Sequence, residues 1–179
     1  MNKIIHSRIG LYLLLVLVMG VPGLANADLR EFKARLSGEQ QVPEEVSTGR
    51  GSAEVRFNPA FRYLLVEVTI RDLVGNVTAA HFHCARAGEN GPVVFGLVAP
   101  GPLALDGNNI KGRLTNADYT GADCVGPVGR TINNIASLAF AMREGLIYLN
   151  IHTDAIGSGE VRGQLVEKDD DLTPTAAGN

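Results

Sequence analysis

Apolar and polar residues alternate with a period of two along much of the chain, a pattern typical of β-strands with one buried face. The alternation is clearest in three segments, 32–36, 53–57 and 64–71. The same pattern, together with β-branched and aromatic residues, predicts further strands at 77–84, 93–98, 110–114, 146–152 and 159–166. Gly, Pro and Asn lie between these segments and favour turns. The chain is therefore expected to be rich in short strands.

One segment departs from the strand pattern. Between residues 131 and 144, apolar side chains recur at helical spacing, and Gly145 follows as a stop signal. Many short strands with one short helix predict an all-β fold, an antiparallel β-sandwich with the helix lying across one end of the sheets. The sequence has no internal repeat and no clear linker, so we expect a single domain.

The two ends of the chain do not follow the strand pattern either. A basic start, an apolar run at 9–21 and small residues at 25–27 form the three parts of a secretory signal peptide. The apolar run is shorter than the roughly 20 residues that span a membrane. The predicted division is a signal peptide at 1–27, a folded domain at 28–166 and a polar, disordered tail at 167–179. We therefore expect a secreted or periplasmic protein.

Charge and motifs narrow the classes of function. The chain has 16 basic and 19 acidic residues and a net charge of −3, and no acidic residue lies in the predicted signal peptide. A weakly acidic protein without a basic cluster is not expected to bind nucleic acid. No second apolar run predicts a membrane span, and nothing indicates a protein partner. Neither a nucleophile elbow nor a recognisable glycosidase carboxylate pair is present, so we predict no catalytic residue.

The two cysteines, Cys84 and Cys124, are expected to form a disulfide, because disulfides persist in exported proteins. The alternative is a free thiolate that acts as a nucleophile or joins nearby histidines as a copper ligand. Strand geometry argues against the copper ligand set. Successive side chains of a strand point to opposite faces, so Cys84 is expected to point away from His83.

Three histidines lie at strand positions with a defined face. His81 and His83 form an H-x-H pair in the strand at 77–84, and alternation turns both rings to one face. His152 ends the strand at 146–152, on the face opposite Leu149 and Ile151. If the two strands are neighbours, three imidazoles converge on one ion, and neutral imidazole suits copper or zinc. The alternative is that each histidine packs and forms hydrogen bonds by itself.

Two carboxylates near the third histidine are candidate outer partners of the site. Metal-bound imidazoles usually donate their other N–H group to an oxygen atom, and Asp154 and Glu160 lie close to His152 in the sequence. The structural alternatives are that Asp154 caps a turn and that Glu160 pairs with Arg162 on the same strand face.

Two stretches resemble the signature motifs of CHRD domains, a family named after chordin and common in secreted microbial proteins. The sequences AHFH at 80–83 and GENGPVV at 88–94 are similar to the family's H-x-H…G-x-N-G-P-V motif. The sequences YLNIHT at 148–153 and GEVRGQL at 159–165 are similar to its Y-x-N-x-H-T…G-E-I-R-G-Q motif. The resemblance covers about residues 30–165, with both motifs in the expected order.

The resemblance implies an immunoglobulin-like β-sandwich similar to copper/zinc superoxide dismutases. It also places His81, His83 and His152 inside the two motifs, which favours a metal site with copper ahead of zinc. Dismutase activity does not follow, because that chemistry needs more imidazoles, one of them bridging two metals. Three functions stay open: a metal-binding protein for storage, delivery or sensing, a non-catalytic extracellular interaction or structural module, and a metalloenzyme with an open ligand position.

Overall fold

The computed structural model describes residues 31–168. The signal peptide predicted at 1–27 lies outside the described residues, as do residues 169–179 of the predicted tail. Within this range, no helix is long and apolar enough to span a membrane. The described chain contains the strands β1 (Glu31–Ser37), β2 (Arg50–Phe57), β3 (Tyr63–Arg71), β4 (Val77–Cys84), β5 (Val93–Val98), β6 (Ala104–Asp106), β7 (Asn109–Thr115), β8 (Ile147–Thr153), β9 (Val161–Gln164) and β10 (Val166–Glu167).

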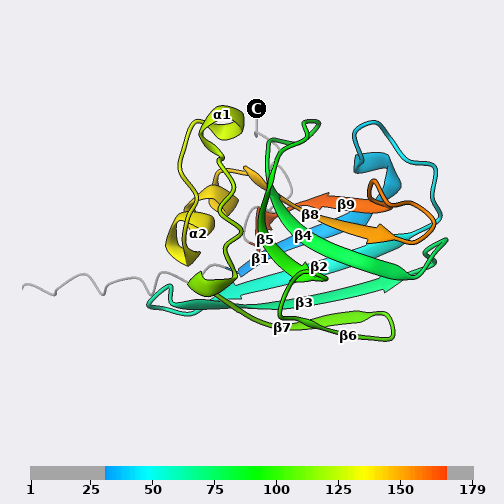
Figure 1. Ribbon diagram of the computed structural model, residues 1–179, viewed down its shortest axis with the longest axis horizontal. Helices are drawn as coiled ribbons and strands as arrows, with labels where there is room; N and C mark the ends of the chain where they lie inside the picture. Colours follow the sequence, from blue (N-terminus) through cyan, green and yellow to red (C-terminus); the bar gives the residue numbers. More distant parts are fainter. Residues whose placement is uncertain (1–30, 169–179) are drawn as a thin grey trace, which may run out of the picture.

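The strands form one continuous antiparallel sheet. Its order is β5-β4-β8-β9-β1-β2-β3-β7-β6, with β10 paired to β1. Figure 1 shows the sheet folded over on itself, so that the β5-β4-β8-β9 part lies above the β1-β2-β3-β7-β6 part. Near the two open edges, the Leu103 N–H donates to the Leu97 carbonyl at 2.9 Å. The predicted all-β sandwich is confirmed, in a nearly closed, barrel-like form.

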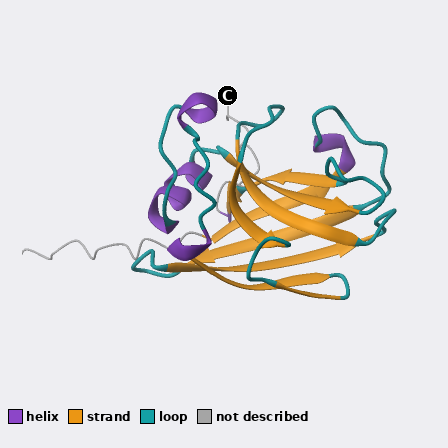
Figure 2. Cartoon of the chain, in the orientation of Figure 1, coloured by secondary structure: helices purple, strands orange, loops and turns teal. Residues whose placement is uncertain are grey.

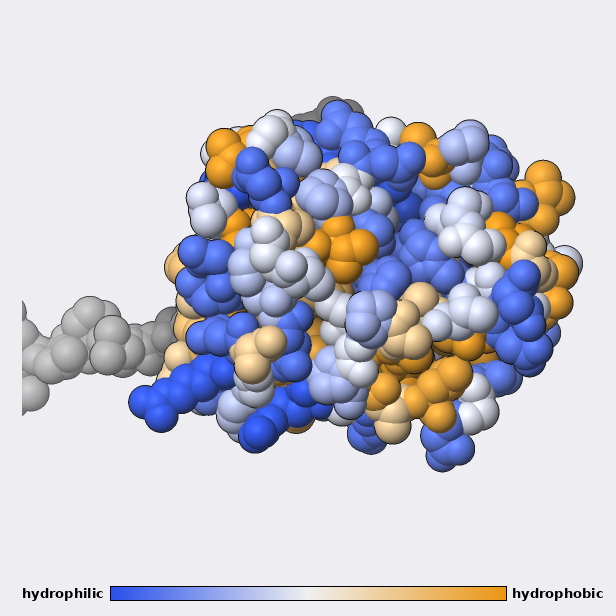
Figure 3. Space-filling view, viewed as in Figure 1, coloured by the Kyte–Doolittle hydropathy of each residue, from blue (hydrophilic) through white to orange (hydrophobic). Residues whose placement is uncertain are grey.

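The alternating residues form the core between the two layers. In the register of β2 and β3, Val55 lies opposite Val66, and both side chains are fully buried. Phe32 of β1 packs edge-on against Phe57 of β2, with ring centroids 5.7 Å apart. Burying one such side chain stabilises the fold by about 1.5–3 kcal/mol. The polar residues that alternate with these core residues point outwards. On the face seen in Figure 3, hydrophobic residues lie in small groups among hydrophilic ones.

Short helices cover one end of the sandwich, and one further helical turn lies at the opposite end (Figure 2). The helical segments are η1 (Gly38–Gln40), η2 (Asn116–Asp118), α1 (Val125–Val128) and α2 (Ile135–Arg143). The helix expected at 131–144 begins later than its apolar spacing suggests, because Asn134 caps it and accepts a hydrogen bond from the Ser137 N–H. It ends as expected at Gly145, which has a φ of 66°. The one-turn helix α1 was not predicted.

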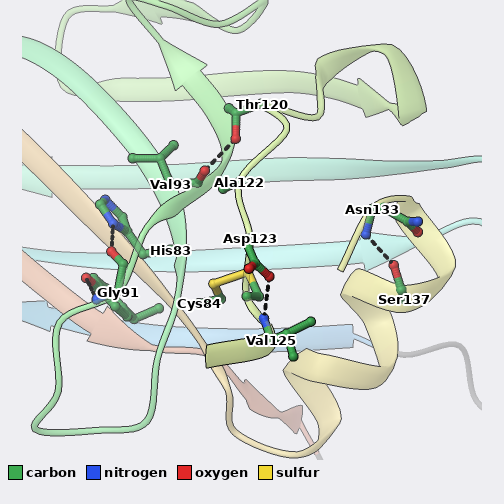
Figure 4. The surroundings of a disulfide bond; sticks show 12 residues. His83, Cys84, Gly91, Val93, Thr120, Ala122, Asp123, Val125, Asn133 and Ser137 are labelled. Carbon is green, nitrogen blue, oxygen red and sulfur yellow. Dashed lines mark hydrogen bonds between the residues drawn. A yellow bond between two sulfur atoms is a disulfide. The ribbon is translucent and has the colours of Figure 1, made fainter. Parts of the chain in front are cut away.

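A disulfide joins this end to β4. Cys84 and Cys124 are bonded, with their Cα atoms 6.0 Å apart (Figure 4). Cys84 is fully buried in the core, whereas His83 lies on the other face of β4. The predicted disulfide is therefore confirmed. The free-thiolate alternative is wrong, because the sulfur atom is occupied by a covalent bond.

Candidate metal centre

The pairing of β4 with β8 brings the three histidines together. The strands are antiparallel neighbours, and their register places His81 opposite Asn150, His83 opposite Tyr148, and Ala79 opposite His152. His81, His83 and His152 therefore share one face of the sheet, as strand alternation predicted. The sequence analysis required these two strands to be neighbours, and the structure shows that they are.

The three imidazoles lie within reach of one ion. Each offers one ring nitrogen, and these nitrogens all lie within 4.8 Å of one another. His81 Nδ1 and His152 Nε2 are 3.2 Å apart. Two imidazole nitrogens bound tetrahedrally to one copper or zinc ion lie about 3.3 Å apart, given bonds of 2.0–2.1 Å. One pair thus already has the spacing of two ligands, whereas the third ring would have to turn so that its nitrogen closes a gap of up to 4.8 Å to that spacing.

Hydrogen bonds orient two of the rings. His83 Nδ1 donates to the Gly91 carbonyl at 2.8 Å (Figure 4), and His152 Nδ1 donates to the Gly157 carbonyl at 3.0 Å. A carbonyl oxygen only accepts, so each Nδ1 carries the hydrogen and each Nε2 keeps its lone pair. Among the described residues, the buried Nε2 atom of His83 has no hydrogen-bond partner. A buried lone pair beside two further imidazoles has the character of a metal ligand.

Asn150 is a site residue that the sequence analysis did not single out. Its side chain is 5% exposed, and its Nδ2 atom lies 3.3 Å from His152 Nε2. Its Oδ1 atom accepts a hydrogen bond from Gln41 Nε2 at 2.7 Å. The sequence could have indicated Asn150, because it lies two residues before His152 and strand alternation places both side chains on one face.

A stack of three side chains supports the other side of the centre. The Tyr148 ring stacks on His83 with centroids 4.8 Å apart and planes 10° apart. The Arg162 guanidinium lies 3.5 Å from the Tyr148 centroid, although Arg162 is only 1% exposed. Its N–H groups donate to three oxygens of the β4–β5 loop, Arg86 O, Glu89 O and Asn90 Oδ1. Arg162 therefore holds the loop that carries Gly91, the hydrogen-bond partner of His83.

The first candidate outer carboxylate, Asp154, forms its hydrogen bonds with a turn. It accepts from the backbone N–H of Asn76 at 2.8 Å and from Asn76 Nδ2 at 3.0 Å. These hydrogen bonds from Asn76 hold the pKa of the Asp154 carboxyl below its usual value. Asp154 thus has the turn-capping role that was its structural alternative.

The second candidate, Glu160, is fully buried and does not pair with Arg162. Its carboxylate accepts hydrogen bonds from Ser47 Oγ, the Val74 N–H and Thr153 Oγ1, at 2.7–2.8 Å. Burial raises its pKa, but these hydrogen bonds outweigh burial and leave the pKa below its usual value. The expected ion pair is wrong, because Glu160 precedes β9 and the alternation of that strand does not apply to it.

Burial keeps two of the imidazoles neutral. Desolvation, aided by the charge of His152, lowers the pKa of His81 to about 4. Desolvation also lowers the pKa of His83 to about 4, although its hydrogen bond to Gly91 acts in the opposite direction. Both rings are therefore unprotonated at neutral pH, which is the form that binds metal ions.

These two pKa shifts predict that the metal-free protein loses stability as the pH falls from 6.5 to about 4. In this window the unfolded chain binds protons at His81 and His83 and the folded chain does not, so protons favour unfolding. Urea unfolding with a chelator at about pH 7 and about pH 5 measures the loss before most carboxylates titrate. The double variant His81→Gln/His83→Gln should lose less between the two pH values. An equal loss in both proteins would contradict the shifts.

Comparison with known families agrees with the motifs. The model of the CHRD domain matches residues 32–165, which include His81, His83 and His152. Searches of curated proteins and of solved structures found no match. The matched segment takes in almost all of the sheet and most of the chain. The chain therefore belongs to the CHRD domain family.

Proposed function

We propose that this CHRD domain is an exported protein that binds one copper or zinc ion through His81, His83 and His152. The observation that carries the proposal is the buried Nε2 atom of His83, which keeps a lone pair without a hydrogen-bond partner among the described residues. Leaving such an atom unpaired costs about 1–3 kcal/mol, and an ion beside it would offset that cost. The bound ion would be held for storage, delivery or sensing.

The three side chains would hold the ion through neutral nitrogens. His83 and His152 would bind through Nε2, because their Nδ1 atoms donate to carbonyls. His81 would bind through Nδ1, which faces His152 in the structure. Sequence resemblance favours copper over zinc. The proposal assigns no catalytic residue.

Metal titration tests the ligand set. We expect one equivalent of Cu or Zn per chain, and His83→Ala should weaken binding by about 100-fold, because loss of an outer partner alone costs 10–100-fold. The matched control is Asp154→Asn, which changes a nearby exposed carboxylate and should bind as the unchanged protein does. Equal affinity of the His83→Ala variant and the unchanged protein would contradict the shared site.

A module without metal is the competing function, and one observation supports it. The Nε2 atom of His152 already lies within hydrogen-bond distance of His81 Nδ1 and Asn150 Nδ2. If these contacts are the purpose of the cluster, the titration should give no specific equivalent, and the histidines are then packing residues of an interaction or structural domain.

Export has a separate test. The disulfide and the signal-peptide pattern at 1–27 support it. Protein recovered from outside the cytoplasm should begin at Asp28, which N-terminal sequencing would detect. A chain that keeps Met1 and stays in the cytoplasm would contradict export.

A further inference from the structure

We infer that the histidine centre selects a monovalent ion, so that copper is held as Cu(I) in preference to Cu(II) and Zn(II). The inference rests on the proposed function and concerns the charge of the cargo. Three features of the described residues carry it: a neutral donor set, a buried cation behind the rings, and restricted contact with water.

The donor set supplies no negative charge. Within the described residues, the cluster contains His81, His83 and His152 and no carboxylate or thiolate. Asp154 and Glu160 form hydrogen bonds elsewhere, and Cys84 is in a disulfide. The whole charge of a bound ion would therefore remain uncompensated. Structural zinc sites usually have four protein ligands, whereas this cluster supplies three.

A permanent positive charge, that of Arg162, lies next to the site on the far side of the Tyr148 ring from His83. Arg162 lies against one face of Tyr148, and His83 lies against the same ring in a parallel stack. The described partners of its guanidinium are neutral oxygens, two carbonyls and one carboxamide, so no carboxylate among the described residues neutralises it. Coulomb repulsion between Arg162 and a bound ion is proportional to the charge of the ion. A divalent ion is therefore repelled twice as strongly as a monovalent one.

Limited contact with water increases the difference. His83 is only 8% exposed, and His81 and His152 are partly buried. The cost of moving an ion out of water rises with the square of its charge, so a divalent ion pays about four times the cost of a monovalent one. A carboxylate or thiolate ligand would offset part of that cost, and among the described residues this cluster offers none.

Competition under anaerobic conditions tests the inference on the unchanged chain. Cu(I) is titrated against a chromogenic Cu(I) chelator, and Cu(II) and Zn(II) are titrated separately. We expect tighter binding of Cu(I) than of Cu(II), so that the bound couple has a higher reduction potential than the aqueous couple. We also expect one equivalent of Cu(I) to displace bound Zn(II).

The variant Asn150→Asp places a carboxylate of the same shape beside His152 Nε2. It should shift the ratio of Zn(II) to Cu(I) affinity towards Zn(II) on the order of 10-fold, and it should lower the reduction potential. The matched control is Asn109→Asp on β7, which adds the same charge at an exposed position and keeps an acceptor for Thr69 Oγ1. It should leave the ratio unchanged.

The outcomes separate the inference from the proposed function. If no ion binds the unchanged chain, the proposed function fails and the inference fails with it. If Cu(II) or Zn(II) binds more tightly than Cu(I), the metal site stands and the inference is overturned. If Asn150→Asp does not fold, the reduction potential of the unchanged chain decides alone.

Discussion

Replacing Arg162 with methionine is expected to lower the free energy of unfolding by about 3–5 kcal/mol, because oxygens of the β4–β5 loop lose a charged donor and each hydrogen bond to a charged group contributes about 1.5–3 kcal/mol. Arg162 is 1% exposed and donates hydrogen bonds to three oxygens of the β4–β5 loop. Methionine fills much of the same volume but donates nothing, so Glu89 O and Asn90 Oδ1 lose this donor, while Arg86 O keeps its hydrogen bond from the Glu89 N–H. The change also removes the cation from the face of Tyr148, a contact of about 2 kcal/mol when desolvated.

The loss should spread to the candidate metal centre. Without Arg162, the loop that carries Gly91 has fewer contacts, and Gly91 is the acceptor that orients the His83 ring. We expect faster hydrogen exchange at the Gly91 N–H, which donates to the Tyr148 hydroxyl at 3.3 Å. Affinity for Cu(I) should fall about 10–100-fold, as for other outer partners. Affinity for Zn(II) should fall less, because the repulsion by Arg162, which is stronger for a divalent ion, is lost as well.

Urea unfolding provides the measurement, and a second arginine provides the control. The Arg71 side chain is 70% exposed, and its ion pair among residues 31–168 is with its neighbour Asp72 at the surface. Arg71→Met should therefore change the stability by less than about 0.5 kcal/mol. Arg162→Lys should recover only part of the loss, since an ammonium group lacks the planar fork that reaches three acceptors. A loss below about 1 kcal/mol in Arg162→Met would show that the loop is held by other contacts.

The strands and the histidine face could be predicted from local pattern. The bounds of β4 and β5 match the predicted 77–84 and 93–98, because each is a short apolar run between turn residues. The segment at 159–166 was predicted as one strand but is divided into β9 and β10, with Leu165 between them bonded to the Ile147 carbonyl. The alternation of apolar and polar residues does not indicate this break, because the break depends on which strand each half of the segment pairs with.

The pairing of strands that are far apart in the sequence could not be predicted from the alternation of apolar and polar residues. His81 and His152 are 71 positions apart, and their contact depends on β4 lying beside β8, which the order of the whole sheet decides. Arg162 was missed for a similar reason. An arginine in an alternating strand is expected to face water, but the β4–β5 loop covers this part of β9 and buries it. Which loop covers which strand is a tertiary fact that periodicity does not contain.

Replacing both cysteines with alanine is expected to destabilise the protein by about 4 kcal/mol, because the cross-link closes a loop of 40 residues and restricts the unfolded chain. Since Cys84 and Cys124 are 0% and 1% exposed, the double variant leaves two apolar side chains in an apolar setting and no unpaired polar atom. The unchanged protein in a strong reductant should show nearly the same loss in urea unfolding. A loss below about 1 kcal/mol in both would show that the cross-link is incidental to stability.

The same variant separates the disulfide from the metal centre. Cys84 lies next to His83 in β4 but points into the core, on the other face of the strand from the imidazoles. Metal affinity of the folded double variant should therefore stay within about two-fold of the unchanged protein, whereas a thiolate ligand would make the loss at least 10-fold. Because domains of this size have only about 5–15 kcal/mol of net stability, a cross-link worth about 4 kcal/mol would make the fold depend on an oxidising compartment. The disulfide thus links the proposed export of the chain to the rigidity of the strand that carries two of its three candidate ligands.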